Sequence, residues 1–262
     1  MKVQVSDSIW LDKNGFGEFN QPVIEFLLRS VENFFTDLGV RSKKGVLVVK
    51  NDENQPICCK SPYDSNLHII KLSTGENFWC QWVYQFAHEY CHHLIDGDLS
   101  GETKGLMWLE ESICHVSSFV CLDNFARLCN KDESLKHNTR NIIGYLRNCL
   151  IEDEEQLYEP YLMVVSNPDK RNLIPKSEYI NLRQYIVDKT EELISKYKME
   201  YYLHIGKALF PLFYNNPKLW QIVPFLGDMM SWGSVSDLYG YLKTNANADY
   251  SASLDELMSC LI

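Results

Sequence analysis

The sequence lacks the long apolar segments that place a protein in or across a membrane. Its apolar runs are short, and the stretch 205–214 is interrupted by Gly206, Lys207 and Pro211. A membrane-spanning helix needs about 20 predominantly apolar residues, which no run here approaches. The first seven residues contain one lysine but no apolar segment of the kind found in secretory signals. The sequence therefore predicts no membrane association and a cytoplasmic location.

Clustered basic residues are also scarce. The chain has 25 Lys and Arg against 35 Asp and Glu, which gives a formal net charge of −10. The one basic cluster, at Arg41, Lys43 and Lys44, has the composition of a solvated turn before a strand. Because binding to a phosphate backbone requires grouped lysines and arginines, we predict no nucleic-acid partner.

The nine cysteines do not form a recognisable disulfide framework. Their number is odd, no CxxC pair occurs, and most of them stand in apolar stretches. Disulfide scaffolds and structural metal clusters show regular cysteine spacing instead. We therefore expect reduced cysteines that pack in the interior.

Apolar periodicity divides the first hundred residues into helices and strands. With 45% hydrophobic residues, a chain of 262 residues can fill a sizeable core. Residues 23–38 carry apolar side chains at helical spacing, and residues 78–95 show a second helical pattern. Between them, the runs 45–50, 56–60 and 67–72 are β-rich and separated by turn residues. These patterns predict a small sheet between two helices.

The second half of the chain is predicted to be helical. Helical patterns cover residues 107–129 and most of 177–215, with a break or cap expected near Pro211 and Pro217. Two capping boxes, at Ser234 and Ser253, predict two short helices that close the chain. The acidic run 151–158 and the polar stretch 166–176 are typical of a connecting loop.

One motif in the second predicted helix carries chemistry. His88, Glu89 and His92 form the pattern HExxH. Positions four apart lie on one face of a helix, so both imidazoles can bind one metal ion at about 2.0–2.1 Å. Glu89 lies one step round the helix, where it can reach a water on that ion and act as a general base. The motif predicts a single zinc ion.

A catalytic zinc ion needs a third protein ligand, and two acidic residues compete for this role. Asp98 stands where the pattern HExxHxxGxxH/D places its last ligand, but Ile95 occupies the glycine position of that pattern. Glu111 follows His92 after 18 intervening residues.

The sequence around Glu111 resembles a known family. HExxH followed after 18 residues by Glu within a Trp-Leu-x-Glu sequence, here Trp108 to Glu111, is similar to the gluzincins, the clan of thermolysin and the zinc aminopeptidases. The similarity covers residues 67–115. It implies a zinc peptidase with His88, His92 and Glu111 as ligands and Glu89 as the base. It also implies that residues 67–72 form the edge strand that pairs with an extended peptide substrate.

Two features of this resemblance concern residues outside the ligand set. Thermolysin-like enzymes have an Asp four residues after the ligand Glu, whereas this chain has His115, which we interpret as a residue that orients a ligand. Zinc peptidases also use a Tyr or His to stabilise the oxyanion. The candidates for this role are Tyr201, Tyr202 and His204, and we place Tyr202 and His204 in the predicted site.

The sequence thus predicts an α+β, gluzincin-like fold in one compact catalytic unit. Residues 1–100 form an N-terminal lobe with a small mixed sheet and the HExxH helix. Residues 101–262 form an all-helical lobe that carries the third ligand, and a zinc cleft lies between the lobes.

The predicted activity is zinc-dependent hydrolysis of a peptide or protein substrate. The alternative is a zinc-binding regulatory or interaction protein whose protease activity is lost or depends on a partner. The oligomeric state does not follow from the sequence.

Overall fold

A computed structural model of the chain describes most of its residues. The described ranges are 1–53, 55–60, 66–96, 105–150, 182–195, 198–227, 234–245 and 250–262. The expected connecting loop at 151–158 and 166–176 and the alternative ligand Asp98 lie outside these ranges. Within them the fold is α+β, as the sequence predicts, with a small mixed sheet and many helices.

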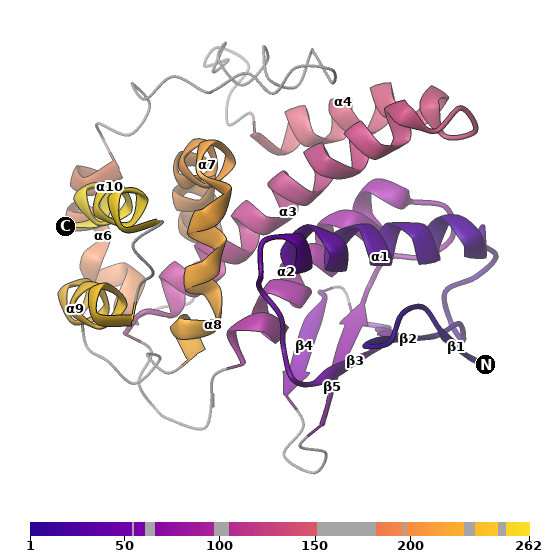
Figure 1. The fold of residues 1–262 in the computed structure, drawn as a ribbon, viewed down its shortest axis with the longest axis horizontal. Coiled ribbons are helices and arrows are strands. Elements are labelled where there is room, and N and C mark those ends of the chain that lie inside the picture. Colours follow the sequence, from indigo (N-terminus) through magenta and orange to yellow (C-terminus); the bar gives the residue numbers. More distant parts are fainter. Residues whose placement is uncertain are drawn as a thin grey trace. The chain divides into compact units, whose positions relative to one another are not determined.

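The sheet has five strands in the order β1-β2-β3-β5-β4 (Figure 1). The strands are β1 (Lys2–Gln4), β2 (Ile9–Asp12), β3 (Gly45–Lys50), β4 (Ile57–Lys60) and β5 (Leu67–Leu72). Strands β2, β3 and β5 run parallel, while β1 and β4 pair antiparallel at the two ends. The predicted strands β3, β4 and β5 are confirmed. Strands β1 and β2 were not predicted, because three and four residues in a polar segment give too short a pattern.

The expectation that residues 67–72 form an edge strand is wrong. Strand β5 lies inside the sheet, where Leu67 pairs with Gly45 of β3 and Ile69 pairs with Cys59 of β4. Strand β4, which precedes β5 in the sequence, pairs antiparallel with β5 and forms hydrogen bonds with the backbone groups on its outer side. The edge on this side of the described sheet therefore belongs to β4.

One face of the sheet is covered by helices. In β5, His68, Ile70 and Leu72 are buried, and the residues that alternate with them are partly exposed. The buried face meets α2 (Trp79–Ile95), because His93 Nδ1 lies 2.9 Å from His68 Nδ1. This hydrogen bond and the apolar neighbours hold the HExxH helix on the sheet.

Helix α1 (Gln21–Asp37) begins at Asn20, whose side chain accepts a hydrogen bond from the amide of Val23. It packs on α2, where the rings of Phe35 and Tyr90 are 6.0 Å apart between centroids. Its polar side contacts the turn before β2 through a hydrogen bond from Ser8 to Glu32. Helix α1 thus links the start of the sheet to the HExxH helix.

Helix α3 (Met107–Lys131) lies against α2. Ser117 Oγ donates to the carbonyl of Ala87 at 2.7 Å, and Ser118 Oγ donates to the carbonyl of Tyr84 at 2.8 Å. A short 3-10 helix, η1 (Lys136–Asn138), leads into α4 (Thr139–Leu150). Helix α4 was not predicted, because its apolar residues form only a narrow stripe in a polar sequence.

The remaining helices are α6 (Leu182–Ser195), α7 (Met199–Asn215), η3 (Pro217–Ile222), α8 (Val223–Leu226), α9 (Val235–Asn245) and α10 (Ser251–Leu261).

The chain divides into two compact units, one of residues Met1–Leu94 and Ser117–Asn172, the other of Ile95–Val116 and Leu173–Ile262. Helix α3 contributes to both units. This division differs from a single boundary near residue 100.

Three details of the helical half test the sequence patterns. The cap at Ser234 is confirmed, because its Oγ accepts from the amide of Asp237 at 3.2 Å. The cap at Ser253 is wrong: this residue lies inside α10, and its hydroxyl donates to Asn216 Oδ1 at 3.1 Å. The break near Pro211 is also wrong. Helix α7 continues through this proline and ends before Pro217, since buried packing around Pro211 offsets the lost backbone hydrogen bond.

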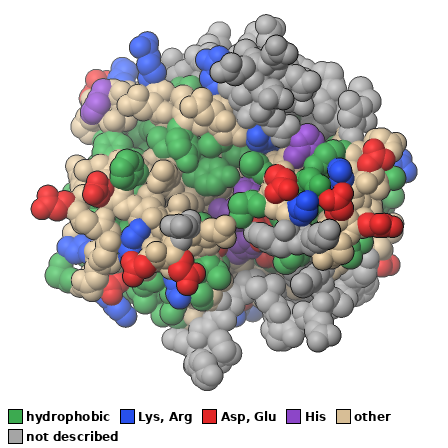
Figure 2. All heavy atoms as spheres, turned by 180° about the vertical axis from the view of Figure 1, so that it is seen from behind, with side chains coloured by type: hydrophobic (Ala, Val, Ile, Leu, Met, Phe, Trp, Pro, Cys, Tyr) green, Lys and Arg blue, Asp and Glu red, His purple; other side chains and the backbone are tan. Residues whose placement is uncertain are grey.

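The helices and one face of the surface bear on two features of the composition, apolar length and charge. No helix in the described ranges combines the length and the apolar character needed to cross a membrane. On the face seen in Figure 2, Lys and Arg side chains are dispersed among Asp and Glu, with no basic cluster visible there.

Helices α3 and α7 approach each other closely at Gly206. A Cβ atom at this position would lie 2.9 Å from the carbonyl oxygen of Ser112 and 2.9 Å from Cβ of His115. Both distances are shorter than a normal van der Waals contact. The helix interior therefore requires glycine here, although glycine lowers helix propensity.

We predict that Gly206→Ala destabilises the protein, while Gly240→Ala in α9 does not. Overpacking at Gly206 should lower the free energy of unfolding by about 1–3 kcal/mol. A Cβ at Gly240 meets no atom within 4 Å, so alanine should add up to about 1 kcal/mol through helix propensity. Urea denaturation of both variants beside the unmodified protein measures the difference. Equal stabilities of the two variants would contradict the close approach.

Candidate metal centre

The HExxH helix is fixed at its first turns by the segment that follows β5. Gln85 Oε1 accepts hydrogen bonds from the amides of Ser73 and Thr74, both at 3.0 Å. Gln85 Nε2 also donates to Ser73 Oγ at 3.1 Å. These bonds satisfy backbone groups that the sheet leaves open, and they set the rotation of α2 one turn before His88.

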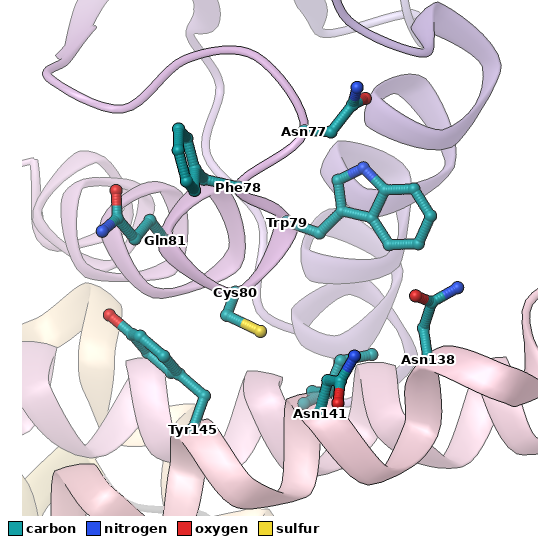
Figure 3. A pocket seen from close by; sticks show the side chains of 9 residues that line it. Asn77, Phe78, Trp79, Cys80, Gln81, Asn138, Asn141 and Tyr145 are labelled. Atoms are coloured by element: carbon teal, nitrogen blue, oxygen red, sulfur yellow. The ribbon is translucent and has the colours of Figure 1, made fainter.

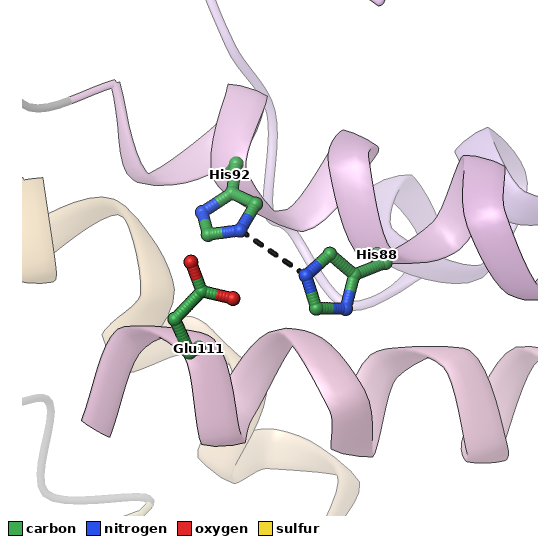
Figure 4. A group of neighbouring side chains, drawn as sticks. All are labelled: His88, His92 and Glu111. Carbon is green, nitrogen blue, oxygen red and sulfur yellow. Dashed lines mark hydrogen bonds between the residues drawn. The ribbon is translucent and has the colours of Figure 1, made fainter. Parts of the chain in front are cut away.

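The two histidines of the motif converge as zinc coordination requires. His88 Nε2 and His92 Nε2 are 3.3 Å apart, and the two nitrogens face each other (Figure 4). Two nitrogens bound to one zinc ion at 2.0–2.1 Å with a tetrahedral angle stand about 3.4 Å apart. A hydrogen bond between the two rings also has this length. The spacing on α2 therefore suits either a shared proton or a shared metal ion.

Glu111 supplies the third donor. One donor atom from each of His88, His92 and Glu111 lies within 4.8 Å of the others. Figure 4 shows the carboxylate of Glu111 directed from α3 toward the two imidazole rings of α2. Helix α3 is continuous, so the hydrogen bonds of Ser117 and Ser118 to α2 also position the turn that carries Glu111. Among the described residues, this group can hold a metal ion.

The donor atoms restrict which ion fits. Two imidazole nitrogens and one carboxylate oxygen suit a borderline transition-metal ion, whereas calcium and magnesium prefer oxygen ligands alone. Three protein ligands also leave one tetrahedral position for water or substrate, which is the composition of catalytic zinc sites. The residues therefore fit the zinc ion that the sequence predicts.

The other acidic residues of the two helices are placed differently. Glu89, between the two histidines on α2, is 4% exposed, and Glu110 on α3 is also 4% exposed. Neighbouring positions on a helix point about 100° apart, so Glu110 and Glu111 cannot face the same point. Glu111 is the member of this pair that joins the histidines.

Of the two proposed oxyanion donors, Tyr202 is the one associated with Glu111. Its side chain is buried in α7, and burial raises the pKa of the hydroxyl, with a further increase from the negative charge of Glu111. His204 lies two positions further along α7 and therefore points to a different side of the helix. Its ring stacks on Tyr185 of α6 with 4.2 Å between centroids. Tyr201 donates from its hydroxyl to Glu192 at 2.8 Å.

Two further histidines have structural surroundings. His115 follows Glu111 by one helical turn, is 4% exposed and lies where α3 meets Gly206 of α7. It is not part of the group of three donors, so its role in orienting a ligand stays a prediction. His93 points to the sheet, as its bond to His68 requires.

Sequence reasoning missed the residues that position the ligands. Gln85, Ser117 and Ser118 hold α2 and α3 in place, and none of them belongs to a chemical motif. The two adjacent serines inside an otherwise apolar helix were the available signal, because a buried hydroxyl needs a hydrogen-bond acceptor.

We predict that Glu111→Ala lowers the affinity for Zn²⁺ substantially. The loss should exceed the roughly 10–100-fold that is typical when a residue that contacts a ligand, rather than the ion, is substituted. Glu110→Ala, the control on the next position of the same helix, should keep tight binding. Competition against a chromogenic chelator gives both affinities, and circular dichroism shows that the variants are folded. If Asp98→Ala loses the metal while Glu111→Ala keeps it, the assignment of Glu111 is wrong.

Comparisons with known proteins found no relative of this chain. The chain matches no protein-family model, no curated protein and no solved structure. The similarity to gluzincins thus rests on the HExxH motif and the spacing of Glu111.

Proposed function

We propose that this chain is a zinc-dependent peptidase. The observation that carries the proposal is the convergence of His88, His92 and Glu111, with Glu89 next to the first ligand on the same helix. A purely structural zinc site has no use for a carboxylate beside its ligands and usually has four protein donors. The proposed architecture is that of the gluzincins, in which a cleft between an N-terminal lobe and a helical lobe takes the substrate.

The chemistry needs an electrophile and a base. His88, His92 and Glu111 would hold the zinc ion, which when bound would lower the pKa of a water to near 7 and polarise the scissile carbonyl. Glu89 accepts the proton released when the water attacks that carbonyl. It then passes the proton to the nitrogen of the leaving amine, so that one water is consumed for each peptide bond broken. The burial of Glu89 keeps competing water away from the proton that it carries.

We propose Tyr202 as the residue that donates a hydrogen bond to the developing oxyanion. Its raised pKa supports this role, because a hydroxyl that stays protonated at neutral and alkaline pH remains a donor. The negative charge of Glu111 also raises the pKa of this hydroxyl, which supports placing Tyr202 near that ligand. His204, which stacks on Tyr185, is the weaker candidate.

We propose that an extended peptide binds along the edge of β4. A strand at the end of a sheet offers unpaired backbone amides and carbonyls that a peptide can extend as a further strand. Strand β4 is the end strand next to β5, and β5 leads directly into the HExxH helix. Ile57 on β4 is 49% exposed, so it can contact a substrate side chain without rearrangement.

Glu89→Gln should abolish peptide hydrolysis and preserve zinc binding, because it removes the base and leaves every ligand in place. The expected loss in kcat is at least about 100-fold, the lower range for general acid–base catalysis. The measurements are cleavage of a peptide library by the zinc-loaded protein and the zinc content of the same samples. Hydrolysis at the unmodified rate would contradict the mechanism.

Tyr202→Phe in the same assay should lower kcat by roughly 10²–10³-fold with little change in KM, because the oxyanion forms only in the transition state. Tyr201→Phe is its control on the same helix and should retain activity. If the unmodified protein binds zinc but cleaves no peptide in the library, the alternative of a zinc-binding regulatory protein is favoured.

A further inference from the structure

A cavity of about 500 Å³ opens beside the first turn of α2. One wall is formed by residues 77–81 at the start of α2, and the other by Asn138 of η1 together with α4. All of the lining residues belong to the first compact unit. Figure 3 shows Asn141 and Tyr145 of α4 directed toward Cys80 and Gln81 of α2. A cavity of this size can take a bulky amino-acid side chain with part of its backbone.

The lining is aromatic and uncharged. Phe78, Trp79 and Tyr145 provide ring surfaces, Ile142 is aliphatic, and carboxamides such as Gln81 and Asn141 provide the polar groups. None of the nine described lining residues carries a formal charge at neutral pH. Burial raises the pKa of the Cys80 thiol to about 11 and that of the Tyr145 hydroxyl to about 12, so both stay neutral. A charged side chain would lose its hydration here without gaining a counter-charge.

Residues of the cavity and of the metal group lie on the same side of α2. Gln81 is exposed, and Tyr84 and Gln85 are partly exposed. His88 follows Gln81 by seven residues, which is close to two full turns, so both lie on the same side. His92 is also partly exposed one turn further along. One stripe of α2 therefore runs from Gln81 at the cavity to His88 and His92, and His88 within it is 7% exposed.

The length of this stripe gives the position of the cavity relative to the scissile bond. Seven residues of α-helix span about 10 Å. An extended peptide advances about 3.3 Å per residue, so it covers the same distance in about three residues. A peptide whose backbone extends β4 on one side of the scissile carbonyl and follows α2 on the other side would bring the side chain three residues away to the cavity.

We propose that this cavity is a specificity subsite for a peptide substrate, and that it takes an uncharged aromatic or large aliphatic side chain three residues from the scissile bond. The inference rests on the proposed peptidase function. Phe78, 59% exposed, forms the outer wall of the subsite and is covered when the substrate side chain enters. Apolar contact with Phe78, Trp79 and Ile142 then provides the binding energy, and the carboxamides hydrogen-bond to the peptide backbone.

The test compares two substitutions of the same kind on α4. Asn141→Trp fills the cavity from an exposed position, while Asn148→Trp places the same side chain on an exposed position of α4 that does not line it. The zinc-loaded full-length proteins are assayed against a peptide library in which Phe, Leu, Ala or Lys is varied at each position around the scissile bond. The readout is the ratio of kcat/KM for Phe and for Ala at each position.

We expect the unmodified protein and Asn148→Trp to prefer Phe over Ala by about tenfold or more at one position three residues from the scissile bond. Asn141→Trp should lose this preference and retain cleavage of the Ala peptides. Phe78→Ala, which removes the outer wall at an exposed residue, should reduce the same preference and serves if the tryptophan variant does not fold.

The two levels of the proposal fail in different ways. Cleavage without a preference at this position, or a preference that persists in both Asn141→Trp and Phe78→Ala, overturns the subsite and leaves the peptidase function intact. Zinc binding without any cleavage by the unmodified protein overturns the peptidase function, and the subsite with it.

Discussion

The contact between α2 and α3 is the constraint on which the candidate site depends. Ser117 and Ser118 are fully or almost fully buried, and their hydroxyls donate to carbonyl oxygens of α2 at 2.7 and 2.8 Å. Small side chains allow the two helices to approach closely, and the hydrogen bonds fix their register. Because α3 is continuous, the same contact determines where Glu111 meets His88 and His92. Any change that shifts α3 by one turn would carry the third donor about 5 Å away from the histidines.

Helices α2 and α3 bury several ionisable side chains close in sequence to the three ligands. Glu89, Glu110 and His115 are each 4% exposed, and His88 is 7% exposed, although apolar residues surround them in the sequence. Removing a carboxylate from water costs several kcal/mol unless its partners are favourable. On the proposed function, a cation held by His88, His92 and Glu111 would add positive charge beside Glu89, which follows His88 on α2.

Local patterns predicted the elements that carry the site, whereas long-range pairing did not follow from them. The HExxH helix and strands β3, β4 and β5 were predicted from periodicity, because each pattern is contained in the element itself. The approach of Glu111 to the two histidines was predicted from its distance along the sequence and from the resemblance to gluzincins. This contact between two helices cannot be read from the periodicity of either helix alone. The position of β5 inside the sheet depends on its pairing with β4, and the hydrogen bond of Ser253 inside α10 depends on Asn216, which lies between α7 and η3. Such pairings between distant segments are set by the whole core.

The most direct measurement is X-ray absorption spectroscopy of the zinc-loaded protein at the zinc edge. If His88, His92 and Glu111 hold the ion with one water, the first shell contains four nitrogen and oxygen atoms at about 2.0–2.1 Å and no sulfur. The spectrum should also show the outer-shell scattering of two imidazole rings. The chain has nine cysteines, so ligation by thiolates is a real competitor. A shell at about 2.3 Å, the distance of zinc to sulfur, would contradict the assigned metal centre and the peptidase function built on it.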